Sequence, residues 1–251
     1  MLVNYTNVHL KHDDRTILSN INMQIHAGEM VYLTGLVGSG KSTLLSSLYG
    51  NTPIYNGKAI VLDKDIKRIN NNRLQYLRRR IGIVHQELRL LPDRTIYDNL
   101  DFVLRATDWD KKDLRKERIN EVLEWVKLND KKNCYPHELS GGQKQCICIA
   151  RAVLNHPELI LADEPTGQLD NESGQHVMTL LNDLRERTGC AVITSTHNTH
   201  WPEIFPGTIY VCENETITKK HSIIAPIDID IQLDANGEIN PESLISEEDN
   251  S

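Results

Sequence analysis

The sequence predicts an α/β protein in which helices cover both faces of a parallel sheet. Two short runs, residues 158–162 and 190–195, are almost entirely apolar and are separated by a stretch with helical spacing. Such runs are typical of parallel strands, because the connecting helices bury both faces of the sheet. The first 33 residues are instead β-rich and alternating, whereas residues 87–133 read as helices. We therefore expect a β-rich start, an α/β core and a helical insertion between them.

Alternating apolar residues predict two amino-terminal strands, over residues 2–10 and 17–25. One face of the second strand is expected to carry Ile17, Ser19, Ile21, Met23 and Ile25. A turn then leads into a β-rich run at 30–34, and a glycine-rich loop precedes a helix over 42–48. The later elements are expected as a strand at 81–85, helices at 95–107 and 112–126, a strand at 158–162, a helix at 174–187 and a strand at 190–195.

The helix over residues 112–126 is expected to be amphipathic, because apolar residues recur at helical spacing with charged residues between them. The apolar positions are Leu114, Ile119, Val122, Leu123 and Val126.

The net charge of −7 is concentrated at the carboxyl end of the chain. There are 28 basic and 35 acidic residues, but residues 221–251 contain eight acids and no lysine or arginine. Residues 1–220 therefore hold 27 acids against 28 bases, which is close to neutral. We expect residues 221–251 to be an acidic extension outside the folded domain. Its first half has an alternating apolar run that suits an edge strand, and its second half has the composition of a disordered segment.

Composition also argues against a membrane-spanning or secreted chain. No apolar run approaches the roughly 18–20 residues that span a bilayer, and the amino terminus lacks a basic segment followed by an apolar one. The five cysteines are odd in number and lack metal-ligand spacing. Cys146 and Cys148 would point about 200° apart on a helix. We expect a cytoplasmic protein whose reduced cysteines are small core residues.

The strongest chemical signal is a glycine-rich loop. Residues 35–42 fit G-x-x-x-x-G-K-[ST], between a β-rich run and a helix. The glycines let successive N–H groups turn toward phosphate oxygens, and the helix adds the positive end of its dipole. Lys41 can reach the β- and γ-phosphates, and the Ser42 hydroxyl can bind Mg²⁺. The predicted triphosphate site comprises Gly35, Leu36, Val37, Gly38, Ser39, Gly40, Lys41, Ser42 and Thr43.

Two acids, Asp163 and Glu164, directly follow the apolar run at 158–162. Ligands of open α/β sheets bind at the carboxyl ends of the parallel strands. We therefore expect Asp163 to hold Mg²⁺ and Glu164 to polarise the attacking water.

Four further segments stand in the order and at the spacing typical of one family. Leu139-Ser140-Gly141-Gly142-Gln143 matches the LSGGQ signature, and Gln86 matches the Q-loop. Residues 167–170 match the D-loop, and His197 matches the H-loop. Over nearly all of residues 1–220, the chain resembles the ATP-binding-cassette (ABC) ATPases.

The resemblance implies the ABC-type P-loop nucleotide-binding domain, an α/β fold. It has a RecA-like parallel-sheet core, an amino-terminal antiparallel β subdomain and a helical signature subdomain. We expect this domain to span residues 1–220, with its helical subdomain at about 87–155. ATP and Mg²⁺ are the implied cofactors, and hydrolysis of ATP is the implied reaction.

The resemblance also implies residue roles. ABC domains pair head to tail, so that each ATP lies between one P-loop and the signature of the partner. The residues that would act on the partner's ATP are Ser140, Gly141, Gly142, Gln143 and Asp170. The implied catalytic residues are Glu164, His197, Gln86 and Lys41. The implied Mg²⁺ residues are Ser42, Gln86 and Asp163.

Two positions depart from the family pattern. His12 stands where an aromatic residue normally stacks on adenine, and imidazole stacks less strongly than tyrosine. We therefore expect His12 to contact ATP with modest affinity and loose base selectivity. Cys146, three residues beyond the signature, replaces the usual arginine and removes a charge near the signature helix.

Within the family, residues 90–100, 137–145 and 161–170 look closest to the FtsE group of bacterial cell-division ATPases. That group implies a homodimer of nucleotide-binding domains bound to an integral, permease-like membrane subunit similar to FtsX. It also implies a peripheral location on the cytoplasmic face of the inner membrane, with membrane contact only through the partner. Asp93–Asn99 would face that partner, unless it is an ordinary surface loop. ATPases of lipoprotein-releasing or macrolide-type exporters are the alternative.

Two other classes fit less well. A regulatory module that binds ATP without turnover would not need the full set of catalytic residues. Soluble ABC proteins of translation carry two cassettes and those of DNA repair carry a long coiled coil, whereas this chain has one cassette and no sustained heptads. The basic group at 78–80 has only Tyr76 as a neighbouring aromatic, so we expect a solvated or membrane-facing patch and no nucleic-acid binding.

Overall fold

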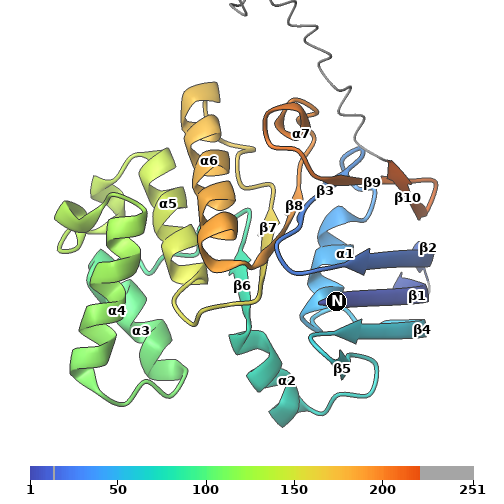
Figure 1. Cartoon of the computed structure of the whole chain (residues 1–251), viewed down its shortest axis with the longest axis horizontal. Helices are drawn as coiled ribbons and strands as arrows, with labels where there is room; N and C mark the ends of the chain where they lie inside the picture. The colour runs from blue at the N-terminus through green and yellow to red at the C-terminus, as the bar shows by residue number, and fades with distance from the viewer. Residues whose placement is uncertain (14, 221–251) are drawn as a thin grey trace, which may run out of the picture.

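A parallel sheet lies at the centre of the molecule, as the apolar runs predict (Figure 1). The computed structural model describes residues 1–13 and 15–220, so the predictions for 221–251 lie outside it. The strand order is β10-β9-β3-β8-β7-β6, and only the β9–β10 pair is antiparallel. The strands are β3 (Met30–Thr34), β6 (Ile81–Val84), β7 (Leu159–Asp163), β8 (Ala191–Ser195), β9 (Thr208–Glu213) and β10 (Thr216–Lys220).

A second, antiparallel sheet forms the amino-terminal subdomain, in the order β2-β1-β4-β5. Its strands are β1 (Val3–His12), β2 (Arg15–Ile25), β4 (Ile54–Val61) and β5 (Lys64–Asp65). One prediction for β2 is wrong: Leu18 is buried, whereas Ile17 and Ser19 are only half-buried. The register shifts by one residue between the pairs Val8↔Ile21 and Leu10↔Leu18. Asn20 lies between those pairs with a φ of 50°, and such a bulge reverses the alternation of faces.

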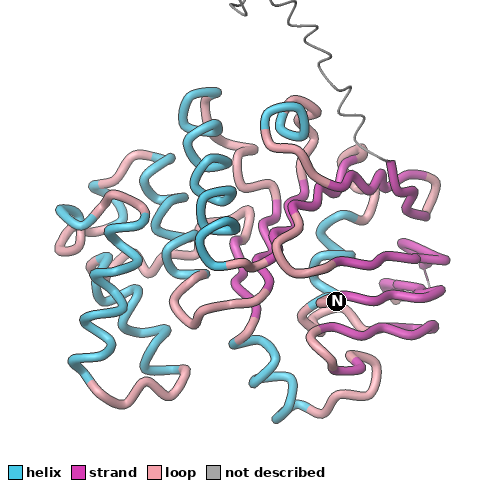
Figure 2. The backbone as a smooth tube through the Cα atoms, viewed as in Figure 1, coloured by secondary structure: helices cyan, strands magenta, loops and turns pink. Residues whose placement is uncertain are grey.

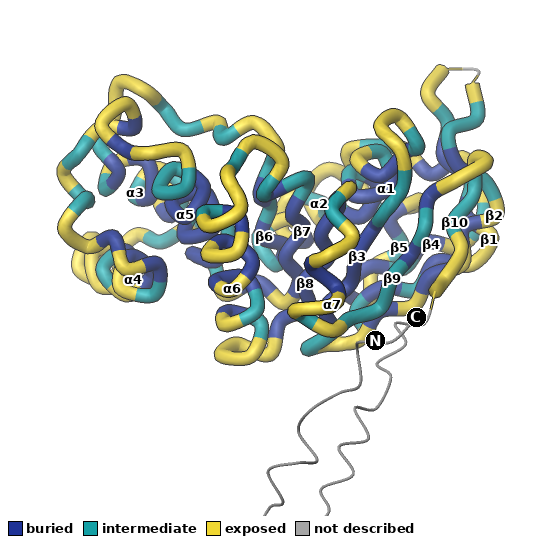
Figure 3. Tube along the Cα trace, turned by 90° about the horizontal axis from the view of Figure 1, so that it is seen from above, coloured by how far each residue is buried: buried dark blue, intermediate teal, exposed yellow. Residues whose placement is uncertain are grey.

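The helices gather on two sides of the parallel sheet (Figure 2). One hydrophobic cluster joins the antiparallel sheet and α1 to one face of the parallel strands, and another joins the helical insertion and α6 to the other face. The central strands β3, β7 and β8 are therefore buried on both sides (Figure 3). The helices are α1 (Lys41–Leu48), α2 (Asn71–Arg79), α3 (Ile96–Ala106), α4 (Lys112–Trp125), α5 (Gly141–Ala152), α6 (Asn171–Thr188) and α7 (Trp201–Ile204).

The helical insertion consists of α3, α4 and α5 with two short 3₁₀ turns, Asn129–Lys131 and Pro136–Glu138. Its amphipathic helix α4 buries the predicted apolar residues except Leu114, whose exposed fraction is 47%. Leu114 precedes Ile119 by five residues, which is about 140° around a helix, so it lies off the apolar stripe. Arg118 takes a buried place instead, and its guanidinium donates to the backbone carbonyls of Val153 and Leu154.

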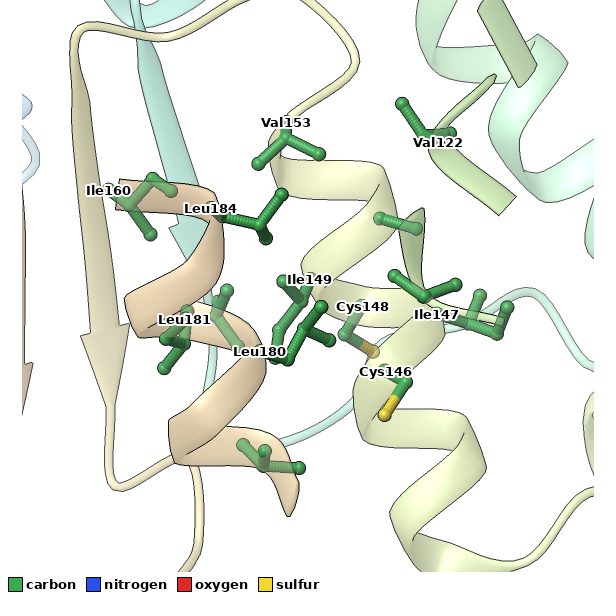
Figure 4. Close-up of a cluster of buried hydrophobic side chains, with 14 of the residues drawn as sticks. Val122, Cys146, Ile147, Cys148, Ile149, Val153, Ile160, Leu180, Leu181 and Leu184 are labelled. Atoms are coloured by element: carbon green, nitrogen blue, oxygen red, sulfur yellow. The ribbon is translucent and has the colours of Figure 1, made fainter. Parts of the chain in front are cut away.

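The signature helix α5 packs between α6 and the rest of the insertion, with Cys146 and Cys148 in the buried cluster (Figure 4). Burial raises the pKa of both thiols to about 11. The prediction that these cysteines are small core residues is confirmed. The Cys148 thiol also donates to the Leu88 carbonyl at 3.1 Å, which ties the helix to the segment after β6.

Gly82 fixes how closely the signature helix approaches the sheet. A Cβ atom at this position in β6 would lie 2.5 Å from the backbone oxygen of Ala152 at the end of α5. Because the obstacle is backbone rather than a flexible side chain, the helix would have to move away.

We predict that Gly82→Ala lowers the free energy of unfolding by about 1–3 kcal/mol, the usual cost of overpacking. Urea unfolding followed by circular dichroism measures this change. Gly141→Ala is the matched control, because its Cβ would meet no atom closer than 3.6 Å. Equal stability of Gly82→Ala and the parent would contradict the close contact.

Candidate ATP site and signature surface

The glycine-rich loop connects β3 to α1, and all three of its glycines have a positive φ angle. Gly35 has a φ of 137°, and a Cβ there would overlap the backbone carbonyl of Cys212 in β9. Gly40 has a φ of 98° and precedes the first residue of α1. L-residues with side chains rarely adopt these angles. The loop therefore curls at the amino end of α1, where backbone N–H groups favour an anion.

Lys41, the first residue of α1, is buried beneath this loop with an exposed fraction of 6%. Its ammonium donates to the carbonyls of Gly35 at 2.8 Å and Leu36 at 2.9 Å. It also lies 3.9 Å from Glu164 Oε1. The chain thus holds a cation between the loop and the acid that follows β7.

Asp163, the last residue of β7, lies beside the start of α1. Its Oδ1 accepts hydrogen bonds from the hydroxyls of Ser42 at 3.0 Å and Ser195 at 2.6 Å. The structure therefore joins two residues that are 121 positions apart in sequence. Sequence reasoning missed Ser195, although its position as the polar end of an apolar strand was the available signal.

Glu164 begins the turn after β7 with a φ of 48°, an unusual angle for a residue with a side chain. Its carboxylate is mostly buried and lies 2.7 Å from Nδ1 of His197. His197 follows β8, and its side chain remains 62% exposed. A carboxylate paired with an exposed imidazole at the rim of a phosphate loop is suited to orienting water.

A hollow of about 310 Å³ lies at the phosphate loop. It is lined by Val37, Gly38 and residues 40–43, and by residues from four distant segments: Ile17, Gln86, Glu164, Gly167 and His197. Gly35, Leu36, Ser39 and Asp163 are not among the described residues that line it. Gln86 thus lines the same hollow as the phosphate loop, and its role there stays a prediction.

His12 does not line this hollow among the residues that the structure describes. Its side chain is 80% exposed at the end of β1, with Nδ1 3.2 Å from the Asp13 carboxylate. Ile17 of β2 contributes an apolar side chain to the hollow, and sequence reasoning missed it. The role of His12 in stacking on adenine stays a prediction.

The signature residues line a different hollow, of about 620 Å³. Ser140, Gly142, Gln143 and Asp170 meet there, whereas in the described part of the chain none of them lines the P-loop hollow. Gly141 lies in the same turn of α5, where an added Cβ atom would lie 3.6 Å from the Leu169 side chain. Four of the five residues expected at the signature surface therefore line one hollow, away from the P-loop of their own chain.

Helix caps hold this signature surface in shape. Ser140 Oγ accepts from the Gln143 N–H at 3.3 Å, and Gln143 Oε1 accepts from the Ser140 N–H at 3.0 Å, which is a capping box at the start of α5. Asp170 caps α6 by accepting from the N–H of Ser173 at 2.8 Å, and this bond lowers the pKa of Asp170. Both helix amino ends thus face the same hollow.

Cys146 forms part of the wall of this hollow from the next turn of α5. It is 2% exposed, and its raised pKa leaves it uncharged near neutral pH. The position therefore contributes an apolar wall.

Comparison with known proteins decides the family. A family model described as ABC transporter matches residues 18–167. The chain belongs to the ABC transporter family. The ABC-type fold and the ATP hydrolysis expected from the motifs are confirmed.

Individual relatives agree with this assignment. The cell division ATP-binding protein FtsE of Bacillus subtilis (strain 168) is 38% identical over 181 residues, which cover 72% of this chain and 78% of that protein. The methionine import ATP-binding protein MetN of Clostridioides difficile (strain 630) is 33% identical over 213 residues, covering 85% of this chain and 66% of that protein. The ABC-cassette structure MJ0796, a dimer in a post-hydrolysis state bound to ADP and Pi, matches with a TM-score of 0.78 and 31% identity, covering 88% of this chain and 98% of that chain.

We predict that Glu164→Gln lowers the turnover number for ATP by roughly 100-fold or more, while ATP binding is kept, because the amide cannot accept a proton from water. Phosphate release under saturating ATP and equilibrium binding measure the two quantities. Glu203→Gln, an exposed acid on α7, is the control. A Glu164→Gln protein that turns over ATP like the parent would remove this residue from the base role.

We predict that ATP and GTP bind with affinities within about tenfold of each other, because His12 would hold the base by stacking and stacking does not distinguish adenine from guanine. His12→Tyr should tighten both complexes by a similar factor. His9→Tyr, on the same strand, is the matched control. Competition binding with a fluorescent nucleotide measures these values, and a hundredfold preference for ATP would contradict the expectation.

Proposed function

We propose that the chain is the ATP-hydrolysing subunit of a membrane ABC complex, in which ATP closes a dimer of two copies and hydrolysis reopens it. The separation of the two hollows carries this proposal. Because the signature residues lie away from the P-loop of their own chain, they can meet a nucleotide only when a second copy brings its P-loop to them. Cassette MJ0796 is described as a dimer, which supports the same arrangement.

The roles in hydrolysis follow from the contacts around the P-loop. Lys41 would bind the β- and γ-phosphates, Glu164 would accept a proton from the attacking water, and His197 would hold that carboxylate and contact the γ-phosphate. In the closed dimer, Ser140 and the N–H groups of Gly141 and Gly142 would bind the partner's γ-phosphate, with Gln143 and Asp170 at the same interface.

The oxygen donors beside the P-loop fit Mg²⁺. The Ser42 hydroxyl and the Asp163 carboxylate lie 3.0 Å apart, and Gln86 reaches the same hollow. Hydroxyl, carboxylate and amide oxygens are the ligands that Mg²⁺ prefers. When bound, the ion would neutralise phosphate charge. Ser42, Gln86 and Asp163 would hold it, directly or through water.

A groove of about 400 Å³ between α2, β6, α3 and α5 supports docking of a permease-like membrane subunit. Arg78, Arg79 and Arg151 line it. Arg151 donates to the carbonyls of Leu88 and Arg89 in the segment that follows Gln86. Movement of a partner in this groove would therefore shift Arg151. The hydrogen bonds of Arg151 would pass that shift to the segment that follows Gln86.

Each guanidinium of the basic group at 78–80 also has an acceptor within the chain. Arg78 donates to the carbonyls of Tyr49 and Gly50, Arg79 pairs with Asp108, and Arg80 pairs with Glu158. Arg78 is exposed, and Arg79 and Arg80 are half-buried. The expectation of a solvated or membrane-facing patch stays a prediction, and the groove lined by Arg78 and Arg79 supports it.

The similarity to FtsE of Bacillus subtilis supports a role in bacterial cell division with an FtsX-like partner. The chain would then lie on the cytoplasmic face of the inner membrane and touch the membrane only through that partner. No helix among residues 1–13 and 15–220 is long and apolar enough to cross a bilayer. The similarity to MetN favours a second candidate, an importer subunit with a different permease. An exporter subunit remains the third.

Affinity purification of the full chain from membranes of its own host tests the partner. We expect an FtsX-like membrane protein to copurify, and deletion of the gene to impair division while methionine uptake is unchanged. Recovery of an importer or exporter permease would contradict the cell-division role.

We predict that Arg94→Glu lowers recovery of the membrane subunit at least about fivefold, because charge reversal in a docking surface weakens association. Arg94 is exposed and stacks on Phe102 of α3, which is itself 49% exposed. Lys58→Glu, an exposed charge reversal in the antiparallel sheet, is the matched control. Unchanged recovery with Arg94→Glu would identify Asp93–Asn99 as an ordinary surface loop.

A further inference from the structure

One buried hydroxyl, that of Ser195, contacts both acids at the end of β7. Ser195 is the last residue of β8 and is fully buried. Its Oγ donates to Asp163 Oδ1 at 2.6 Å and accepts the backbone N–H of Glu164 at 2.8 Å. A hydroxyl has one hydrogen and two lone pairs, so it makes both bonds at once.

Sheet register places Ser195 between the acids. Asp163 and Ser195 lie opposite each other in the parallel β7–β8 pair. Glu164 then leaves the sheet in the left-handed region, with a φ of 48°. A backbone N–H that turns away from the strand ladder needs another acceptor, and the Ser195 hydroxyl provides it. The same contact favours the left-handed conformation that the Glu164 backbone otherwise resists.

Both hydrogen bonds of the Ser195 hydroxyl hold groups that are proposed to act in ATP hydrolysis. The turn at Glu164 brings its carboxylate to His197 at 2.7 Å and to within 3.9 Å of the Lys41 ammonium. The oxygen of Asp163 that Ser195 holds is also the one that accepts from Ser42 at 3.0 Å. Removing the Ser195 hydroxyl would free the Asp163 carboxylate to rotate and would leave the Glu164 N–H without this acceptor.

We propose that Ser195 is a positioning residue for ATP hydrolysis, whose single hydroxyl orients the Asp163 carboxylate toward Mg²⁺ and holds the backbone turn that presents Glu164 to water. It acts through the two acids and not on the nucleotide. The inference rests on the roles proposed above for Asp163 and Glu164.

Ser195→Ala tests this, with Thr194→Val as the matched control. Thr194 precedes Ser195 on β8 and is equally buried, but within residues 1–13 and 15–220 its hydroxyl hydrogen-bonds only to the Ser195 carbonyl, at 3.4 Å. Each variant therefore removes one buried hydroxyl from the same strand. Only Ser195→Ala removes contacts to the acids, so a difference between the two variants reports positioning rather than general stability.

In the full chain, Ser195→Ala should lower kcat by about 10- to 100-fold, the usual effect of losing a contact that orients a ligand-holding group. KM for ATP should change by less than about threefold, because the phosphate loop is untouched. The Mg²⁺ concentration for half-maximal activity should rise. In calorimetry, ATP binding in EDTA should match the parent, whereas the gain in affinity on adding Mg²⁺ should shrink.

Thr194→Val should match the parent in all four measurements. Parent-like kcat and Mg²⁺ dependence in Ser195→Ala would overturn the inference, as would an equal loss in Thr194→Val, which would indicate a purely structural role. If the parent itself needs no Mg²⁺, or if Glu164→Gln keeps full turnover, the roles proposed for the acids fail first, and this inference fails with them.

Discussion

The site depends on one constraint: three buried strands must end level at one edge of the parallel sheet. Leu33 of β3, Ser195 of β8 and Asp163 of β7 lie in one row across the sheet. The residues just beyond this row begin the phosphate loop, the Glu164 turn and the segment that carries His197. A slip of one residue in the β7–β8 pairing would separate the hydroxyl of Ser195 from Asp163, because successive side chains point to opposite faces.

Burial on both faces enforces that register. All five residues of β8 and the first four of β7 are buried, and a separate hydrophobic cluster packs against each face of the sheet. The polar side chains of the site therefore lie at or beyond the ends of these strands. They bond to one another: Ser42 and Ser195 to Asp163, and His197 to Glu164. The signature helix is connected to the same frame through Gly82, where only a glycine permits its close approach.

The sequence predicted the parallel strands and the order of the motifs well, because continuous apolar runs and glycine patterns are local signals. Strand β3 was predicted with its observed ends, and α5 was placed through its signature motif. Features that depend on the partner strand were not predictable. The bulge at Asn20 reversed the faces of β2. The start of α6, three residues earlier than expected, was instead a missed local signal, because Asp170 caps the helix through Ser173. The bond between Ser195 and Asp163 joins residues 32 positions apart and becomes visible only when the register is known.

The central claim is that each ATP site is completed by the signature of a second copy. Lys41→Ala disables the P-loop. Ser140→Asp disables the signature while keeping a good helix cap, because its added charge repels phosphate. Each variant alone should be inactive. Mixing the two in equal amounts should restore about a quarter of the parent ATPase activity, since half of randomly formed dimers then contain one intact site out of two. A mixture as inactive as its components would show that the signature serves the P-loop of its own chain.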